Sequence, residues 1–552
     1  MRYDCDIVVV GGGPVGLFLA AELGMRGLSV LLFDDKTGAS KHPAANANSA
    51  RTMEHYRRIG ISHQIRELGL PGDHATDVAY YTRLSQHELA RLSQPSRNEA
   101  VAQVHERSFL WPTPEPPHRC SQLYIEPVLR QAAEKYHAVT IDYCATVTDI
   151  RQSADGVQVS VDYSNGLARK EVRSKYVVGC DGPRSTVRSL LGLQYSGTAG
   201  EKRDFMGGRM AAAFFSAPDL YKVVGGARAW QYWTLNHDQR ALLIAVDGVD
   251  KFVINVQLQE DQKPQSSDVN QRICNAIGLN IPIELISTTL WTAGFALVAE
   301  KVRVGRVFLA GDSAHLFTPT GGMGYNTGIE DAANLAWKLE AAVKGFAGTS
   351  LLDSYATERI PAATRNTQFA REFADSIGHV RLPAEIDENN HMGRATRDSV
   401  GKHLAFHAHK EFVIPGVQLG TRYEGSSIVS TEHGQPPPDN ANLYLPSARP
   451  GHRAPHVWMK DGSSLYDHFA TGFTLLNFTS LGAASLVRRN GGDSADLTEH
   501  RVKSTEARDL YGADFVLIRP DHHVAWRGNR LDLAFEKARA RAFGISVPPS
   551  TI

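Results

Sequence analysis

The sequence is poor in cysteine, which restricts the kinds of site that it can hold. Only five cysteines occur among 552 residues, none forms a CxxC pair, none has metal-ligand spacing and none lies beyond residue 274. A small, odd and scattered set argues against a disulfide framework and against a cysteine-ligated zinc site. We therefore expect no metal site, and a reducing, cytoplasmic location fits the sequence best.

Net charge and uninterrupted apolar runs are also missing. Lys plus Arg and Asp plus Glu both number 59, so the formal net charge is zero and gives no long-range attraction to nucleic acid or to an anionic membrane. The most apolar stretch, residues 7–33, contains a glycine triplet, Glu22 and Arg26. Because it also begins as a strand, we interpret it as neither a membrane span nor a signal peptide. A chain of this length predicts two or three domains.

What the sequence does contain is a glycine-rich turn near its N-terminus. Residues 7–10 form a β-branched run suited to a buried parallel strand, and Gly11, Gly13, Pro14 and Gly16 follow at once. Gly11 allows a tight turn, Gly13 lets the backbone approach a pyrophosphate, and Gly16 lets the next helix pack on the strand. The first amides of that helix would face the phosphates. The pattern predicts a Rossmann-like dinucleotide site; the alternative is a glycine-rich turn in an ordinary βαβ unit.

An acidic residue closes the second strand of this unit, which we place at residues 29–33. Asp34 is the first residue past the strand and Asp35 the next, about 20 residues after the glycines as the dinucleotide fingerprint expects. A carboxylate there can accept hydrogen bonds from a ribose. We favour Asp34, with Asp35 as the alternative. The motif by itself does not separate NAD from FAD.

Two later segments repeat the strand-to-helix pattern. In residues 176–188 an Asp-Gly turn at Asp181 precedes a helix that Ser185 can cap. In residues 306–344 a strand ends at Asp312, and a glycine-rich loop then leads into a helix at about residues 327–344. The Asp312 carboxylate can bind hydroxyls of a ribityl chain, and the helix N-terminus would stabilise an anionic reduced flavin. Taken singly, each segment could instead be an ordinary connecting loop.

In this order, the three segments resemble the FAD-dependent aromatic hydroxylases, the single-component flavoprotein monooxygenases that include p-hydroxybenzoate, phenol and polyketide hydroxylases. The resemblance is carried by GGGPVG with Asp34, by CDGPRSTVR around Asp181, and by GDSAHLFTPTGGMGYNTGIEDAANLAWKL, within residues 1–371. It implies an enzyme with FAD as cofactor, NADPH or NADH as transient reductant, and O2 and a small phenol-like aromatic molecule as substrates. Hydroxylation would pass through a flavin C4a-hydroperoxide.

The resemblance also implies roles for single residues. The Asp181 segment would serve both FAD and the nicotinamide cofactor, Asp312 would bind the ribityl and pyrophosphate region, and Pro319 would lie near the reacting edge of the flavin. Arg51 and Gln122 match residues that approach FAD; the alternatives are a surface arginine at a helix start and a solvated helix residue. The loop at the pyrimidine ring would act through its backbone, and it comprises Gly322, Met323, Gly324, Tyr325 and Asn326.

Two departures from the family pattern matter for the chemistry. Met323 and Tyr325 stand where the family often has Gln and Leu, an exchange that backbone contacts should survive. Asn46 stands near the position of a carboxylate that helps activate the phenol in phenol hydroxylase. Because an amide cannot act as a base, that catalytic role must lie elsewhere or be absent.

Alternating segments between residues 206 and 290 predict a mixed β-sheet, with strands at 210–214, 229–235, 241–246 and 252–258. The resemblance places such a sheet over the substrate ring. Alternation puts Trp230 and Tyr232 on one face and Trp233 on the other. We favour Tyr232 as a substrate contact and offer His237 as a phenol-deprotonating base, although packing is the more common role of such residues.

The predicted fold class is α/β, with three domains and a helical linker. Residues 1–200 and 290–375 would form a discontinuous FAD-binding domain, residues 201–289 an inserted substrate-binding sheet, and residues 376–433 a helical linker. A Pro-rich break at 434–439 opens a C-terminal domain, 434–552, that resembles the thioredoxin-like domain of the phenol hydroxylase branch. Because it lacks cysteine, structural support or homodimer contact is its expected role.

Two other functions remain open from the sequence. Another flavoenzyme, such as an oxidase or a halogenase, would share the same motifs, although the WxWxIP segment of flavin halogenases is absent. A non-catalytic protein that keeps the fold without flavin is the second alternative. Asp34, Asp312 and the glycine-rich loop at Gly322 argue against it, since a fold without flavin has no need of all three.

Overall fold

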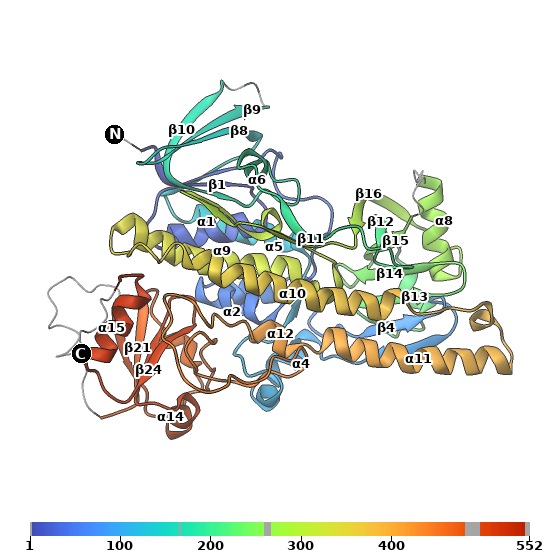
Figure 1. The fold of residues 1–552 in the computed structure, drawn as a ribbon. Coiled ribbons are helices and arrows are strands. Elements are labelled where there is room, and N and C mark those ends of the chain that lie inside the picture. The colour runs from blue at the N-terminus through green and yellow to red at the C-terminus, as the bar shows by residue number, and fades with distance from the viewer. Residues whose placement is uncertain (1–2, 165, 167, 259–265, 481–496, 547–552) are drawn as a thin grey trace.

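The computed structural model describes residues 3–164, 166, 168–258, 266–480 and 497–546. The parts of the predicted domains at 259–265, 481–496 and 547–552 lie outside the described residues. The architecture is mixed α/β, with a largely parallel sheet, a second and mostly antiparallel sheet, and a smaller C-terminal sheet (Figure 1).

The first sheet follows the order β18-β19-β10-β1-β2-β7, and its strands are parallel except for β18. Three hydrophobic side chains of β1 are fully buried, as expected for a strand covered on both faces. Helix α1 contacts both α5 and α9 beside this sheet. The strands are β1 (Cys5–Val10), β2 (Val30–Phe33), β7 (Val139–Asp142), β10 (Lys170–Gly179), β18 (Arg303–Val304) and β19 (Val307–Leu309); the helices are α1 (Pro14–Met25), α5 (Gln122–Glu134) and α9 (Met323–Lys344).

Short elements extend this part of the molecule. Strands β8 (Ala145–Gln152) and β9 (Val157–Tyr163) continue from β10 as an antiparallel ribbon (Figure 1). A three-stranded sheet of β11 (Tyr195–Thr198), β17 (Ala296–Ala299) and β20 (His315–Phe317) lies at the passage to the second sheet. Helix α2 (Ala50–Arg58) contacts α9, and β3 (Ala47–Asn48) pairs with β6 (His118–Arg119).

The second sheet contains the four strands that the alternation predicted. They are β12 (Gly208–Ser216), β13 (Gln231–Leu235), β14 (Arg240–Ala245) and β15 (Lys251–Gln257). The full order is β16-β12-β15-β14-β13-β4-β5. The predicted range 201–289 omits β4 (Val78–Tyr81) and β5 (Glu88–Leu92), which come from the N-terminal part of the chain, and the end of β16 (Glu284–Ala293). Strand β4 pairs in parallel with β13, although the two strands are far apart in the sequence. No local sequence pattern encodes such a pairing.

Two long helices connect the parts. Helix α10 (Ser354–Gly378) runs from the first sheet toward the second, with Pro361 inside it, and α11 (His391–Phe412) packs along β4 and β5 (Figure 1). Helix α8 (Ser266–Ile277) lies beside the second sheet. Residues 376–433 are therefore mostly helical. Among the described residues, none of the helices combines the length and apolar composition that spanning a membrane requires.

The C-terminal sheet has the order β22-β21-β23-β24, with β21 and β22 parallel and the other pairs antiparallel. Its strands are β21 (Phe473–Asn477), β22 (Leu497–Arg501), β23 (Phe515–Ile518) and β24 (Val524–Gly528), with helices α14 (Thr505–Tyr511) and α15 (Leu533–Ala542). His522 has φ of 62° in the turn between β23 and β24, so the His522-His523 pair belongs to a hairpin.

The C-terminal part is fastened to the rest by buried charges. Glu358 of α10 accepts hydrogen bonds from Lys338 of α9 at 2.7 Å and from both Nη atoms of Arg519 at 2.7 and 2.9 Å. Burial opposes ionisation, yet Arg519 and Lys338 lower the pKa of Glu358 to about 2. The carboxylate therefore stays charged at neutral pH and holds two cations from separate parts of the chain.

Candidate active site

The N-terminal glycines occupy three different environments. Gly11 has φ of 108°, and a Cβ there would lie 2.4 Å from the Cys180 carbonyl oxygen. A Cβ on Gly16 would lie 1.9 Å from the carbonyl oxygen of Gly11. A Cβ on Gly13 would meet nothing within 4 Å. Gly11 and Gly16 are thus required by the turn and by helix packing, whereas Gly13 faces open space at the start of α1, where Pro14 is the first helical residue.

The two acids after β2 differ in burial. Asp34 is buried, and its carboxylate accepts hydrogen bonds from the amides of Gly12 at 2.5 Å and Lys36 at 2.8 Å. Asp35 is exposed. Asp34 therefore lies against the glycine turn, where a ribose beside the pyrophosphate would be, and the preference for it over Asp35 is consistent with the geometry.

Asp181 lies directly against the glycine turn. A Cβ on Gly11 would come within 2.8 Å of the Asp181 Cα. The Asp181 carboxylate accepts hydrogen bonds from Ser185 Oγ at 2.6 Å and from the Val187 amide at 3.0 Å. It thereby caps α6 (Thr186–Leu190), and Ser185 also caps this helix by accepting from the Arg188 amide. Burial raises the pKa of Asp181.

Asp312 combines an exposed side chain with a perturbed acidity. Its carboxylate is exposed to solvent, yet the surrounding protein raises its pKa, with the nearby His315 opposing the rise. A group with these two properties lies in a recess rather than on a convex surface. A Cβ on Gly324 would lie 3.9 Å from Asp312 Oδ1, so the carboxylate faces the first turn of α9.

The glycine-rich loop adopts a backbone that only glycine takes readily. Gly321 has φ of 69° and Gly322 φ of 62°, and α9 begins immediately afterwards at Met323. Pro319 is exposed, whereas Met323 is buried in an apolar cluster with Phe373 and Ala370. Two left-handed residues aim the N-terminal amides of α9 toward the side on which Asp312 lies.

Two side chains that follow Gly324 are already engaged. The Tyr325 hydroxyl is paired with the hydroxyl of Tyr56. Asn326 uses its whole amide: Oδ1 accepts from the Ser49 amide at 2.9 Å and Thr52 Oγ1 at 2.6 Å, and Nδ2 donates to the carbonyls of Ala47 at 2.9 Å and Gly322 at 2.6 Å. Asn326 therefore clamps the loop, β3 and the start of α2 together, so its side chain is not available to a cofactor.

Replacing Asn326 with alanine is expected to weaken cofactor binding about tenfold, because the loss of four hydrogen bonds frees Gly322 and β3 from each other. Equilibrium titration of the FAD-free protein with FAD, followed by flavin fluorescence, measures this. Asn236→Ala is the matched control: Asn236 is buried, accepts from the amides of Asp238 and Gln239 and donates to Thr82, but lies in the second sheet. Equal FAD affinity in both variants would contradict the clamp.

The loop before α2 lies close to the other predicted contacts. The Gln122 amide donates to the carbonyl of Ala45 at 2.7 Å, and the Cys120 amide donates to the carbonyl of Asn46 at 3.1 Å. The Gln122 side chain is bonded to Glu126 Oε1 at 2.5 Å. Gln122 and Asn46 are thus brought together at one end of α5, in the neighbourhood of Asn326 through β3.

Arg51 does not face this neighbourhood. Its guanidinium pairs with Glu54 at 2.8 Å and donates to the carbonyl of Asp521 in the C-terminal part at 2.5 Å. The prediction that Arg51 approaches the cofactor is corrected: the side chain is buried at the interface with the C-terminal domain. Its position on α2 turns it toward a segment 470 residues away in the sequence, which no local pattern could reveal.

The two residues proposed for the substrate side also lie away from these groups. Tyr232 is fully buried, and its hydroxyl accepts from the Ala229 amide at 2.7 Å and donates to the Ala227 carbonyl. His237 is exposed in the turn between β13 and β14, with its amide bonded to Asp387. The structure therefore gives Tyr232 a packing role and leaves His237 at the surface, which argues against both as catalytic groups.

Two acids that the sequence reading passed over hold the site together. Asp331 of α9 accepts hydrogen bonds from the Gly311 amide at 3.0 Å, from His315 Nε2 at 2.7 Å and from Arg359 at 2.7 Å. Burial would raise its pKa, but His315 and Arg359 outweigh burial and hold it below its usual value. Glu411 of α11 accepts from the Gly321 amide at 2.9 Å. An acid on the buried stripe of an apolar helix was the available signal for Asp331.

Comparison with known families agrees with this geometry. Residues 4–370 match the family described as the FAD binding domain, and residues 447–545 match the one described as aromatic-ring hydroxylase, C-terminal. The chain belongs to the FAD-dependent aromatic hydroxylases. It is therefore an enzyme of that family with FAD as its cofactor. The open position at Gly13 and the recessed Asp312 carboxylate fit this cofactor.

Individual relatives align over nearly the whole chain. Aklavinone 12-hydroxylase RdmE of Streptomyces purpurascens is 31% identical over 553 residues, covering 95% of this chain and 95% of that protein. 2,4-Dichlorophenol 6-monooxygenase of Cupriavidus pinatubonensis is 28% identical over 592 residues, covering 96% and 94%. Among solved structures, the rebeccamycin biosynthetic enzyme RebC with reduced flavin superposes with a TM-score of 0.88 at 32% identity, covering 98% of this chain and 99% of that one.

Proposed function

We propose that the protein is an NADH- or NADPH-consuming monooxygenase that hydroxylates a phenol-like aromatic compound. The observation that carries the proposal is the convergence of three distant segments on one side of the first sheet. These are the open turn at Gly13, the Asp181 turn that lies against it, and the segment that carries both the recessed Asp312 and the left-handed loop at Gly321 and Gly322. Relatives named as hydroxylases of aromatic compounds support the reaction class.

Each part of the chain has a distinct task in this proposal. The β1-α1-β2 unit acts as a Rossmann-like site, in which the α1 amides bind pyrophosphate and Asp34 binds a ribose. Bound FAD, once reduced, supplies the activation of O2 and the transfer of one oxygen atom to the ring. Asp312 orients the ribityl chain, and the N-terminus of α9 stabilises the negative charge of the reduced flavin. Pro319, exposed beside the loop, would border the reacting edge.

The domain boundaries are part of the proposal. The FAD-binding part comprises residues 1–200 and 290–375, except that strands β4 and β5, within residues 78–92, belong to the second sheet. In the proposal the second sheet lies on the substrate side. The order β22-β21-β23-β24, with one parallel pair, supports a thioredoxin-like C-terminal domain. Its buried hydrogen bonds with α2, α9 and α10 support a structural role.

NAD(P)H oxidation by the FAD-loaded protein tests the function. Each of NADH and NADPH is offered with a panel of phenols, and peroxide and product mass are followed together. Faster oxidation with one phenol and a product heavier by one oxygen atom are the expected results. Oxidation that yields only peroxide with every phenol would mean that the panel lacks the substrate. A flavin that neither nucleotide reduces would contradict the proposal and favour an oxidase. The chain is also similar to RebC, whose structure holds reduced flavin. The specific alternative outcome is therefore a different flavin-dependent oxidation, whose product is not simply heavier by one oxygen atom.

A further inference from the structure

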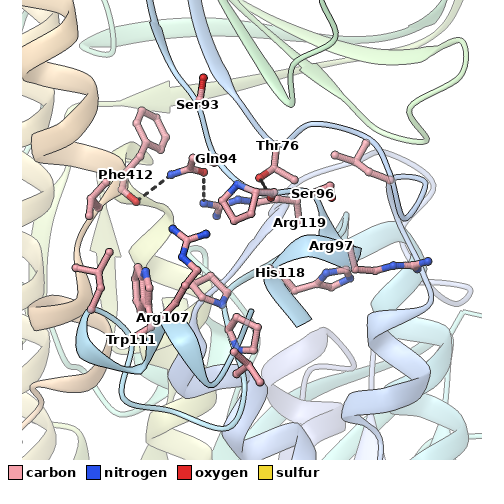
Figure 2. A pocket seen from close by; sticks show the side chains of 18 of the residues that line it. Thr76, Ser93, Gln94, Ser96, Arg97, Arg107, Trp111, His118, Arg119 and Phe412 are labelled. Atoms are coloured by element: carbon pink, nitrogen blue, oxygen red, sulfur yellow. Dashed lines mark hydrogen bonds between the residues drawn. The ribbon is translucent and has the colours of Figure 1, made fainter. Parts of the chain in front are cut away.

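A cavity of about 110 Å³ opens between the segment after β5, the helices around residues 97–111 and the end of α11 (Figure 2). Helix α4 (Arg97–Ala102) and the 3-10 helix η1 (Glu106–Phe109) form one wall. The apolar part of the lining includes Trp111, Pro116, Pro117 and Phe412. None of the residues predicted from the sequence to bind cofactor or substrate lines it.

One cation in this cavity has no counter-charge. The guanidinium of Arg119 stacks 4.0 Å from the ring centroid of Trp230 and donates to Gln94 Oε1 at 3.2 Å. No carboxylate among the described residues lies within ion-pairing distance of Arg119, and burial without such a partner lowers its pKa to about 10. The nearby Glu115 is already bound by Arg57 and Arg66. A half-buried cation without an acid partner is costly unless an anion from outside completes the site.

The cavity has two further arginines, of which Arg97 is paired. Arg97 donates to the Arg66 carbonyl at 2.9 Å and lies 3.4 Å from Glu67. Arg107 is half-buried and points into the cavity toward Gln94 and Arg119 (Figure 2). The cavity is therefore positive, with aromatic and proline walls on which a flat group can lie.

Both walls of the cavity connect directly to the glycine-rich loop. Arg119 of β6 pairs with Ala47 of β3, and a Cβ on Gly322 would lie 2.9 Å from the Ala47 Cβ. Phe412 follows Glu411, which binds the Gly321 amide. A ligand in the cavity would thus be separated from the proposed flavin loop by one strand and one side chain.

The volume limits what the cavity can hold. An engineered apolar cavity of about 150 Å³ is known to bind benzene. At about 110 Å³, this cavity has room for one small ring, or for one arm of a larger molecule, and not for a fused polycycle.

We propose that this cavity binds a planar aryl oxyanion, a carboxylate or a phenolate on a single aromatic ring, with Arg119 as the residue that binds the charge. The inference rests on the proposed function, since the ligand would be the anionic end of the substrate. Arg119 donates to the oxyanion, Arg107 adds a second positive charge, and the ring lies along Trp111 and Phe412.

Isothermal titration of the FAD-loaded protein tests the proposal with probes matched in shape. Benzoate is compared with benzamide, and 4-nitrophenolate with nitrobenzene, so that the two anion types are separated. We expect at least one anion to bind about tenfold or more tightly than its neutral counterpart. Arg119→Gln should remove this preference and Arg119→Lys should restore part of it, while Arg130→Gln, at an exposed surface pair, should leave it unchanged.

Several results would overturn the proposal. These are equal binding of anion and neutral counterpart to the wild-type protein, no detectable binding of either anion, or unchanged anion affinity in Arg119→Gln. The comparison of anion with neutral probe uses the wild-type protein, so it tests the proposal even if the Arg119→Gln protein does not fold. Arg119-dependent binding of 2′-phospho-ADP-ribose in place of the aryl anions would make the cavity a nucleotide site. NAD(P)H oxidation in the same preparations separates the two proposals: flavin reduction without anion binding contradicts only the cavity, and the converse contradicts only the function.

Discussion

Replacing Gly13 with valine is expected to abolish FAD retention while leaving the protein folded. Gly13 has φ of −75° and ψ of −179°, an extended backbone that valine adopts readily, and a Cβ there meets no protein atom within 4 Å. The new side chain would instead fill the space that a pyrophosphate needs in front of the α1 amides. We expect the dissociation constant for FAD to rise about 100-fold, about 2.7 kcal/mol in binding free energy.

The measurement is the flavin absorbance of the purified protein together with its thermal unfolding temperature. Gly16→Val serves as the contrasting variant, because its Cβ would lie 1.9 Å from the carbonyl oxygen of Gly11. That substitution should lower both flavin content and thermal stability, since α1 could no longer pack on β1. A yellow Gly13→Val protein with wild-type flavin content would show that the pyrophosphate does not bind at this turn.

Replacing Glu358 with alanine is expected to cause a large loss in the free energy of unfolding. Glu358 is buried and binds Arg519, Lys338, Ser426 at 2.6 Å and Asn334 at 2.7 Å. Its removal would leave Lys338 as a buried cation without a carboxylate and Arg519 with Asp521 alone. Breaking one side of a buried ionic network costs about 3–5 kcal/mol, because the remaining charge is neither hydrated nor paired.

Urea unfolding, followed by tryptophan fluorescence, measures this cost. Trp337 is a suitable probe because the Arg519 guanidinium lies 5.2 Å from its ring centroid at the interface. Glu134→Ala is the matched control, since Glu134 forms an exposed pair with Arg130, and such pairs contribute within about 1 kcal/mol. If the two variants unfold at the same urea concentration, the network does not hold the C-terminal part in place.

The sequence alone determined the local units of this protein. The run of β-branched residues, the glycine spacing and the acid at position 34 specify strand, turn, helix and strand within a short segment. Gly11 and Gly16 are required by contacts with near neighbours in the chain or in the adjacent strand. Strands β12 to β15 of the second sheet and the helix that follows Gly322 also follow from periodicity, because alternation and helical spacing are set by residues close in sequence.

The direction of single side chains was decided by tertiary contacts. Arg51 turns toward Asp521, the side chain of Asn326 binds β3 and α2, and the hydroxyl of Tyr232 bonds to the segment just before β13. The addition of β4 to the second sheet and the unpaired charge of Arg119 likewise depend on segments far apart in the chain. Residue type and spacing fix what a side chain can do, but its partner is fixed only when distant segments pack, because hydrogen bonds and ion pairs depend on distance in space.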